Sequence, residues 1–180
     1  MAGAGELAPE ILVVGLGNAL RRDDGLGPAV VEALANGWEV GSRRVRTLVT
    51  PQLEIDLAAE LAGIAHLILV DARADDRPDD VIVERAEARS GSVAPHSTHA
   101  VGIPLFLELA RDVYGAAPRC YLVMPKGHDF SFGEGLSERA LANAALARQA
   151  VLDLVAKLWA APVHPANATA SPASRPCSPG

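Results

Sequence analysis

The feature that most restricts the fold of this chain is a set of short runs that are almost entirely apolar. They are Ile11–Gly15 (ILVVG), His66–Val70 (HLILV) and Cys120–Met124 (CYLVM). Such runs are typical of parallel strands covered on both faces, because a strand exposed on one face would alternate apolar and polar residues. Two weaker strands are predicted at residues 45–49 and 81–83.

Segments with helical spacing alternate with these strands. After the first strand, Leu26, Val30 and Leu34 lie on one face of a predicted helix. We therefore expect an α/β fold, a three-layer α/β/α sandwich whose twisted, mostly parallel, five-stranded sheet has helices on both faces. The predicted helices span residues 26–34, 53–61, 101–114 and 137–158. The buried stripe of the last helix should contain Leu141, Leu146, Val151, Val155 and Leu158.

The length of 180 residues suits one domain. Residues 11–160 should form it, with residues 1–10 as a flexible N-terminus. Residues 161–180 are rich in Pro, Ala, Ser and Thr and are predicted to be a disordered tail.

The overall charge and composition exclude several classes of partner. The formal net charge is −6, which disfavours binding to nucleic acid or to anionic membranes. The first residues do not form a secretory signal, and the apolar runs are too short to cross a bilayer. The two cysteines give neither a disulfide framework nor a metal-binding spacing. We expect a cytoplasmic monomer.

Several polar residues are predicted to gather at one end of the sheet, where ligands bind in open α/β folds. Asp23 and Asp24 follow the first strand, Asp71 follows the third, and His96 and His99 precede a helix. Two carboxylates and an imidazole would suit a divalent transition metal. Each residue alone also has a structural interpretation, since an aspartate can cap a helix or close a turn and a histidine can begin a helix at the surface.

The glycine loop after the first strand invites comparison with a dinucleotide-binding loop. Gly15 and Gly17 match the start of that fingerprint, but Leu20 stands where its third glycine belongs. The aspartates that follow would repel a pyrophosphate. Nucleotide binding is therefore disfavoured. Ser97 and Thr98 lie beside the two histidines, but no third group completes a catalytic triad.

Four segments together resemble the hydrogenase maturation endopeptidases. The first is ILVVGLGNALRRDDGLGPAVVEAL, which is similar to the opening of that family, and the second is HLILVDA. The third is STHAVGIPLFLELA, and the fourth is FSFGEGLSERA, which precedes the last helix. The resemblance covers about residues 11–158.

The resemblance implies the chemistry and the partner. Asp24, Asp71 and His99 match the nickel ligands of the family, and the nickel is carried by the substrate. That substrate is the precursor of a [NiFe]-hydrogenase large subunit, from which the family removes a C-terminal extension. A non-proteolytic, nickel-dependent docking protein for the large subunit is the alternative.

One segment departs from the family pattern. The sequence TLVTPQLEIDL has Thr47 in place of a frequent histidine and Gln52 in place of the usual glutamate. The difference concerns which hydrogenase is served, and Thr50 and Gln52 are candidates for positioning the substrate. The roles of Asp23 and His96 stay open.

Overall fold

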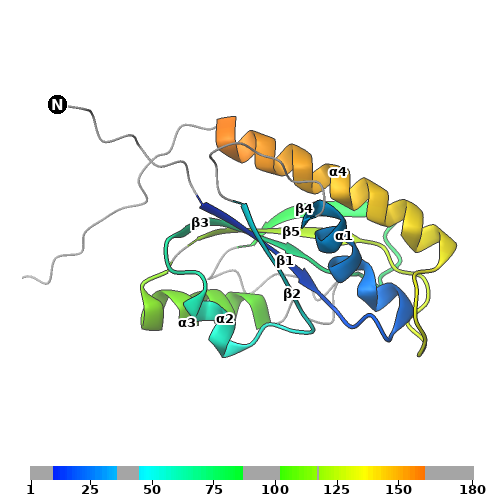
Figure 1. Cartoon of the computed structure of the whole chain (residues 1–180), viewed down its shortest axis with the longest axis horizontal. Coiled ribbons are helices and arrows are strands. Elements are labelled where there is room, and N and C mark those ends of the chain that lie inside the picture. Colours follow the sequence, from blue (N-terminus) through cyan, green and yellow to red (C-terminus); the bar gives the residue numbers. More distant parts are fainter. Residues whose placement is uncertain (1–9, 36–44, 87–101, 117, 161–180) are drawn as a thin grey trace, which may run out of the picture.

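A computed structural model of the chain describes residues 10–35, 45–86, 102–116 and 118–160 (Figure 1). Its centre is one five-stranded sheet with the strand order β2-β1-β3-β5-β4. The strands β2, β1, β3 and β5 are parallel, and β4 is antiparallel to β5 at one edge. The strands are β1 (Glu10–Leu16), β2 (Val45–Thr50), β3 (Ile64–Val70), β4 (Val81–Ala86) and β5 (Arg119–Pro125).

Helices cover both faces of this sheet, which confirms the predicted three-layer fold (Figure 1). One face carries α1 (Leu26–Ala35) and α4 (Glu138–Ala160), and the other carries α2 (Ile55–Ala59) and α3 (Ile103–Tyr114). A short 3₁₀ helix, η1 (Arg22–Gly25), leads directly into α1. Each face has its own apolar core, so β1, β3 and β5 are buried on both sides. None of the helices described is long and apolar enough to cross a bilayer.

Two glycines bring the start of α1 against the ends of two strands. A Cβ atom on Gly27 would lie 2.2 Å from the carbonyl oxygen of Leu16 and 2.4 Å from that of Val70. A Cβ atom on Gly15 would lie 2.5 Å from the carbonyl oxygen of Gly27. Because no side chain fits between these backbones, the glycines hold η1 and α1 at the carboxyl ends of β1 and β3.

The predicted buried stripe of the last helix is wrong in its first half. Leu141 and Leu146 are exposed. The long helix places smaller residues against the sheet and α1, so its apolar leucines were a poor guide to its inner face. The buried residues are Ala140, Asn143, Ala147, Val151, Val155 and Leu158.

One helix is shorter than predicted, and the segment after β3 contains a buried charge. The helix predicted over residues 53–61 is only α2, with Leu53 before it and Leu61 in the turn that follows, although Leu61 is buried as expected. The segment between β3 and β4 is largely exposed, but Arg73 is fully buried within it. An ion pair with Asp75 compensates the charge of Arg73.

Candidate functional site

The carboxyl ends of β1, β2 and β3 meet at one end of the sheet. Leu16 is paired with Thr50, and the N–H of Gly17 donates to the carbonyl oxygen of Thr50 at 3.3 Å. On the other side of β1, Gly15 is paired with Val70, the last residue of β3. The residues that follow these three strands therefore share this end of the sheet, which we call the acidic rim because Asp24 and Asp71 lie there.

Asp24 reaches the acidic rim through η1, and its side chain closes the glycine loop. Its Oδ2 atom accepts a hydrogen bond from the N–H of Asn18 at 2.8 Å. A Cβ atom on Gly17, whose φ is +132°, would lie only 1.9 Å from the carbonyl oxygen of Asp24. The contact requires glycine at that position. The carboxylate of Asp24 is partly exposed and its orientation is fixed from one side.

Asp71 directly follows β3 and is buried. Its N–H donates to the carbonyl oxygen of Val123 at 3.1 Å, which continues the parallel ladder between β3 and β5 by one residue. The position of Asp71 is thus set by the sheet itself, whereas that of Asp24 is set by a loop and a 3₁₀ turn. Both carboxylates predicted from the sequence lie at the same end of the sheet.

Asp23, the neighbour of Asp24, has a structural role that its sequence context did not reveal. Its carboxylate is fully buried and receives four hydrogen bonds. The donors are His128 N–H (2.7 Å), Asp129 N–H (2.9 Å), Ser137 N–H (2.7 Å) and Ser137 Oγ–H (2.8 Å). Burial by itself raises the pKa of Asp23, but the hydrogen bonds outweigh it and hold the pKa below its ordinary value. These hydrogen bonds hold the loop of residues 128–137 against η1.

The fastened loop also pairs with the glycine loop along its backbone. The N–H of Arg22 donates to the carbonyl oxygen of Gly133 at 3.0 Å, and the N–H of Gly133 donates to the carbonyl oxygen of Leu20 at 2.9 Å. Leu20 is exposed, and Phe132 is 86% exposed, with the guanidinium of Arg21 5.8 Å from its ring centre. The sequence signal for this loop was the segment FSFGEGLSERA, without any indication of its partner.

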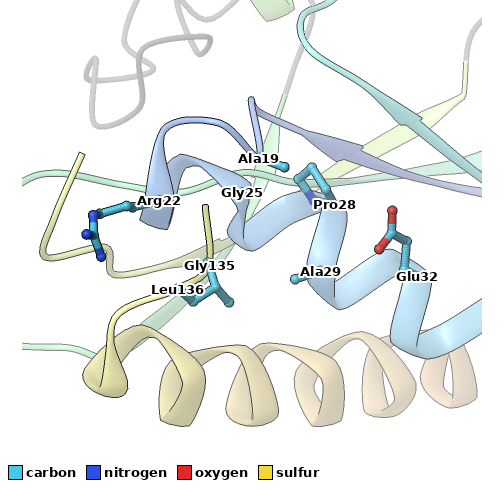
Figure 2. A pocket seen from close by; sticks show the side chains of 8 residues that line it. All are labelled: Ala19, Arg22, Gly25, Pro28, Ala29, Glu32, Gly135 and Leu136. Atoms are coloured by element: carbon cyan, nitrogen blue, oxygen red, sulfur yellow. The ribbon is translucent and has the colours of Figure 1, made fainter. Parts of the chain in front are cut away.

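A small cavity of about 150 Å³ lies beside the acidic rim, not within it. Figure 2 shows it between η1, the first turns of α1 and the loop that leads into α4. Neither Asp24 nor Asp71 lines it, so it is separate from the predicted metal site. The lining residues are Ala19, Arg22, Gly25, Pro28, Ala29, Glu32, Gly135 and Leu136.

The third predicted metal ligand, His99, lies outside the described residues, as does His96. Within the part of the chain that the structure describes, no group of three His, Cys, Asp or Glu residues is arranged to hold a metal ion. The described part of the acidic rim therefore contributes two carboxylates. Oxygen ligands of this kind suit a divalent metal whose remaining ligands come from elsewhere.

Comparison with solved structures identifies the fold family. The chain is similar to the hydrogenase maturating endopeptidase HybD from E. coli, with 25% identity and a TM-score of 0.68 over 82% of this chain and 93% of that one. It is also similar to a hydrogenase 2 maturation peptidase from a Thaumarchaeota archaeon, with 25% identity and a TM-score of 0.61 over 82% of this chain and 98% of that one. The chain therefore shares the fold of the hydrogenase maturation endopeptidases.

The likeness in fold extends to solved structures of lower sequence identity. The maturation protease HybD from Thermococcus kodakarensis has 22% identity and a TM-score of 0.63 over 81% of this chain and 98% of that one, which shows the shared fold. No family model matches the sequence, and no curated protein sequence matches it. The family likeness is therefore carried by the arrangement of elements together with the few motifs at their ends.

The segment that departs from the sequence pattern of these endopeptidases begins at the acidic rim. The Oγ–H of Thr50 donates to the carbonyl oxygen of Gln52 at 3.0 Å, which turns the chain after β2. The side-chain amide of Gln52 donates to Glu54 at 3.4 Å. Thr50 and Gln52 thus shape the turn between β2 and α2, next to the glycine loop.

Proposed function

We propose that this peptidase removes the C-terminal extension from the nickel-loaded precursor of a [NiFe]-hydrogenase large subunit. One observation carries the proposal: neighbouring strands deliver Asp24 and Asp71 to the same end of the sheet, in a fold shared with hydrogenase maturation endopeptidases. The sequence likeness around Asp24, Asp71 and His99 supports the same reaction.

The chemistry is hydrolysis of one peptide bond: water adds to the carbonyl carbon, the C–N bond breaks, and the departing amine takes up a proton. The nickel is part of the substrate, and Asp24, Asp71 and His99 would complete its ligand shell. A metal ion held there can polarise the scissile carbonyl or acidify a bound water. Because Asn18 binds one oxygen of Asp24, the other oxygen has a fixed direction.

Binding of the metal requires ionised carboxylates and a neutral imidazole. Protons compete with the metal for these groups, so capture of the nickel-loaded precursor should weaken in acid. Capture of only the loaded form would make cleavage a test of completed metal insertion. The net charge of −6 is compatible with a cationic substrate surface.

The test is cleavage of the large-subunit precursor, purified with and without nickel and analysed by mass spectrometry. We expect loss of a C-terminal peptide from the loaded precursor alone. Asp24→Asn should abolish this cleavage. Asp112→Asn should preserve it, because Asp112 is an exposed residue of α3 that pairs only with its neighbour Arg111 among the contacts described.

Three results would each contradict a different part of the proposal. Undiminished cleavage by Asp24→Asn would remove Asp24 from the reaction. Nickel-dependent co-purification of the two proteins without cleavage would make this chain a docking protein for the large subunit. Neither cleavage nor binding would separate its function from hydrogenase precursors altogether.

A further inference from the structure

Strand β2 forms one edge of the sheet and presents part of its backbone outward. Within the described residues it pairs only with β1. Because the carbonyl oxygen of Thr50 accepts from Gly17, the backbone groups of Thr50 point toward β1. Backbone N–H and C=O groups point to alternate sides along a strand, so those of Thr47 and Val49 point away from the sheet.

The side chains along this edge are also suited to contact with another strand. Val45 packs on the core beneath α1 and α4, whereas Arg46 pairs with Glu60 on the opposite face. Leu48 and Val49 therefore lie on opposite faces, and they are 37% and 40% exposed. An aliphatic side chain is available on each face of the same short edge.

The two edges of the sheet are protected to different degrees. Natural proteins usually guard an edge strand with charged residues, because an unpaired edge attracts other strands. At the far edge, β4 carries two charged residues, Arg85 and Glu84, and the latter pairs with Arg77. In β2 the single charged residue is Arg46, which is already paired with Glu60, and residues 47–53 carry no charge. Within the described residues, the β2 edge therefore carries fewer charges than β4 and is the less protected against strand addition.

The β2 edge also ends at the site of the proposed reaction. Thr50 contacts Gly17, and the backbone of Asp24 lies directly against Gly17. We propose that the C-terminal extension of the precursor binds along β2 as an added, antiparallel strand. This inference rests on the proposed function, which identifies the extension as the ligand.

The antiparallel direction follows from where the scissile bond must lie. The extension begins just after that bond, so its first residue has to be at the acidic rim. From there it can run from Thr50 back toward Val45, with the folded part of the precursor beyond the end of the sheet. A parallel course would put the scissile bond at the wrong end of β2, about 20 Å away at ~3.3 Å per residue.

In this arrangement Thr47 and Val49 would each exchange an N–H and a C=O bond with the extension, about four hydrogen bonds in total. Contacts of this kind hold almost any extended sequence, and the side chains opposite Leu48 and Val49 would add selectivity for apolar residues. The strand β2 would therefore orient the extension, and the acidic rim would determine which peptide bond is cleaved.

The first measurement is hydrogen exchange at single amides in the Asp24→Asn chain, mixed with nickel-loaded precursor or with mature large subunit that lacks the extension. We expect the amides of Thr47 and Val49 to exchange more slowly with the precursor only. At concentrations where the precursor co-purifies with the Asp24→Asn chain, no slowing, or equal slowing with both proteins, would overturn the inference. If the amides of Thr47 and Val49 already exchange slowly without any large subunit, and the chain is a dimer in solution, the inference is also overturned and the β2 edge binds a second copy.

The second measurement compares two edge prolines. Val49→Pro removes an outward N–H, which an edge strand tolerates. Val83 in β4, which is 46% exposed, is the matched control. Its partner Val123 directs its carbonyl oxygen toward β3, where it accepts from Asp71. Val83 and Val123 are therefore not hydrogen-bonded to each other, and the N–H of Val83 also points outward. Loss of one hydrogen bond should raise KM for the precursor at least about fivefold in Val49→Pro, and Val83→Pro should match the unmodified chain.

Equal KM values for the two folded proline variants would refute the role of β2. If thermal melting shows that Val49→Pro is unfolded, the exchange experiment decides, since it leaves β2 unchanged. Cleavage assays on the unmodified chain separate the two proposals. Cleavage without slowed exchange in β2 contradicts the strand addition alone, and slowed exchange without cleavage contradicts the endopeptidase function alone.

Discussion

Replacing Asp23 with asparagine should destabilise the protein far more than the same change at Asp24. The carboxylate of Asp23 is fully buried, with three donors at Oδ2 and the N–H of Ser137 at Oδ1. Asparagine keeps the shape but has only one acceptor oxygen. In its best orientation the amide oxygen keeps the three donors, and its NH₂ group then faces the N–H of Ser137.

The expected cost can be worked out from these contacts. One buried donor loses its acceptor, which costs roughly 1–3 kcal/mol. The three remaining hydrogen bonds change from charge-assisted to neutral and lose about half their strength. We expect the free energy of unfolding to fall by about 3 kcal/mol. For a domain of this size that lowers Tm by about 6–12 °C.

The assay is thermal and urea unfolding of three proteins: the unmodified chain, Asp23→Asn and Asp24→Asn. Asp24 is partly exposed and accepts one described hydrogen bond, from Asn18, so its replacement should lower Tm by no more than about 4 °C. Asp24→Asn should instead lose cleavage activity. If Asp23→Asn melts within about 2 °C of the unmodified chain, the assigned role of this carboxylate is wrong.

The stability difference should also depend on pH in a defined direction. The pKa of Asp23 is lowered in the folded protein, so its carboxylate contributes its full stabilisation above the ordinary value of 3.8. That contribution is lost as the pH falls from there through the lowered pKa. The gap between the unmodified chain and Asp23→Asn should be constant from about pH 5 to pH 8 and shrink below about pH 4. A gap that widens in acid would contradict this assignment.

Three further predictions follow from packing and burial. Gly27→Ala should lower the free energy of unfolding by ~2 kcal/mol or more and lower Tm, because its Cβ would lie 2.2 Å from a carbonyl oxygen of β1. Gly102→Ala is the control: a Cβ there meets no atom within 4 Å among the described residues, so Tm should stay unchanged or rise slightly. Burial raises the pKa of the Cys120 thiol to about 12. Iodoacetamide at pH 8 should therefore leave Cys120 unmodified in the folded protein and alkylate it in urea, as measured by mass spectrometry. Alkylation of Cys120 without urea would show that the thiol is accessible. Val151→Ala should cost about 2 kcal/mol in urea unfolding and Leu146→Ala less than about 0.5 kcal/mol, and equal costs would contradict the assigned inner face of α4.

The sequence by itself determined the order of strands and helices along the chain and the end of the sheet at which the acidic residues lie. Continuous apolar runs identify buried parallel strands because both faces of such strands need apolar side chains. Once β1 and β3 are parallel, whatever follows them must lie at the same end. The common placement of Asp24 and Asp71 was therefore predictable without any knowledge of their contacts.

Only the tertiary structure decided which face of a helix is buried and what each polar group binds. Helix α4 has more apolar residues than its inner face can hold. Packing against the sheet buries Ala147 and Val151, whereas Leu146 is exposed. Asp23 and Asp24 are adjacent and chemically identical, yet one is a buried structural group and the other borders the acidic rim. The donors to Asp23 come from residues more than 100 positions later in the chain, and no local pattern can reveal a hydrogen bond that exists only after the chain has folded.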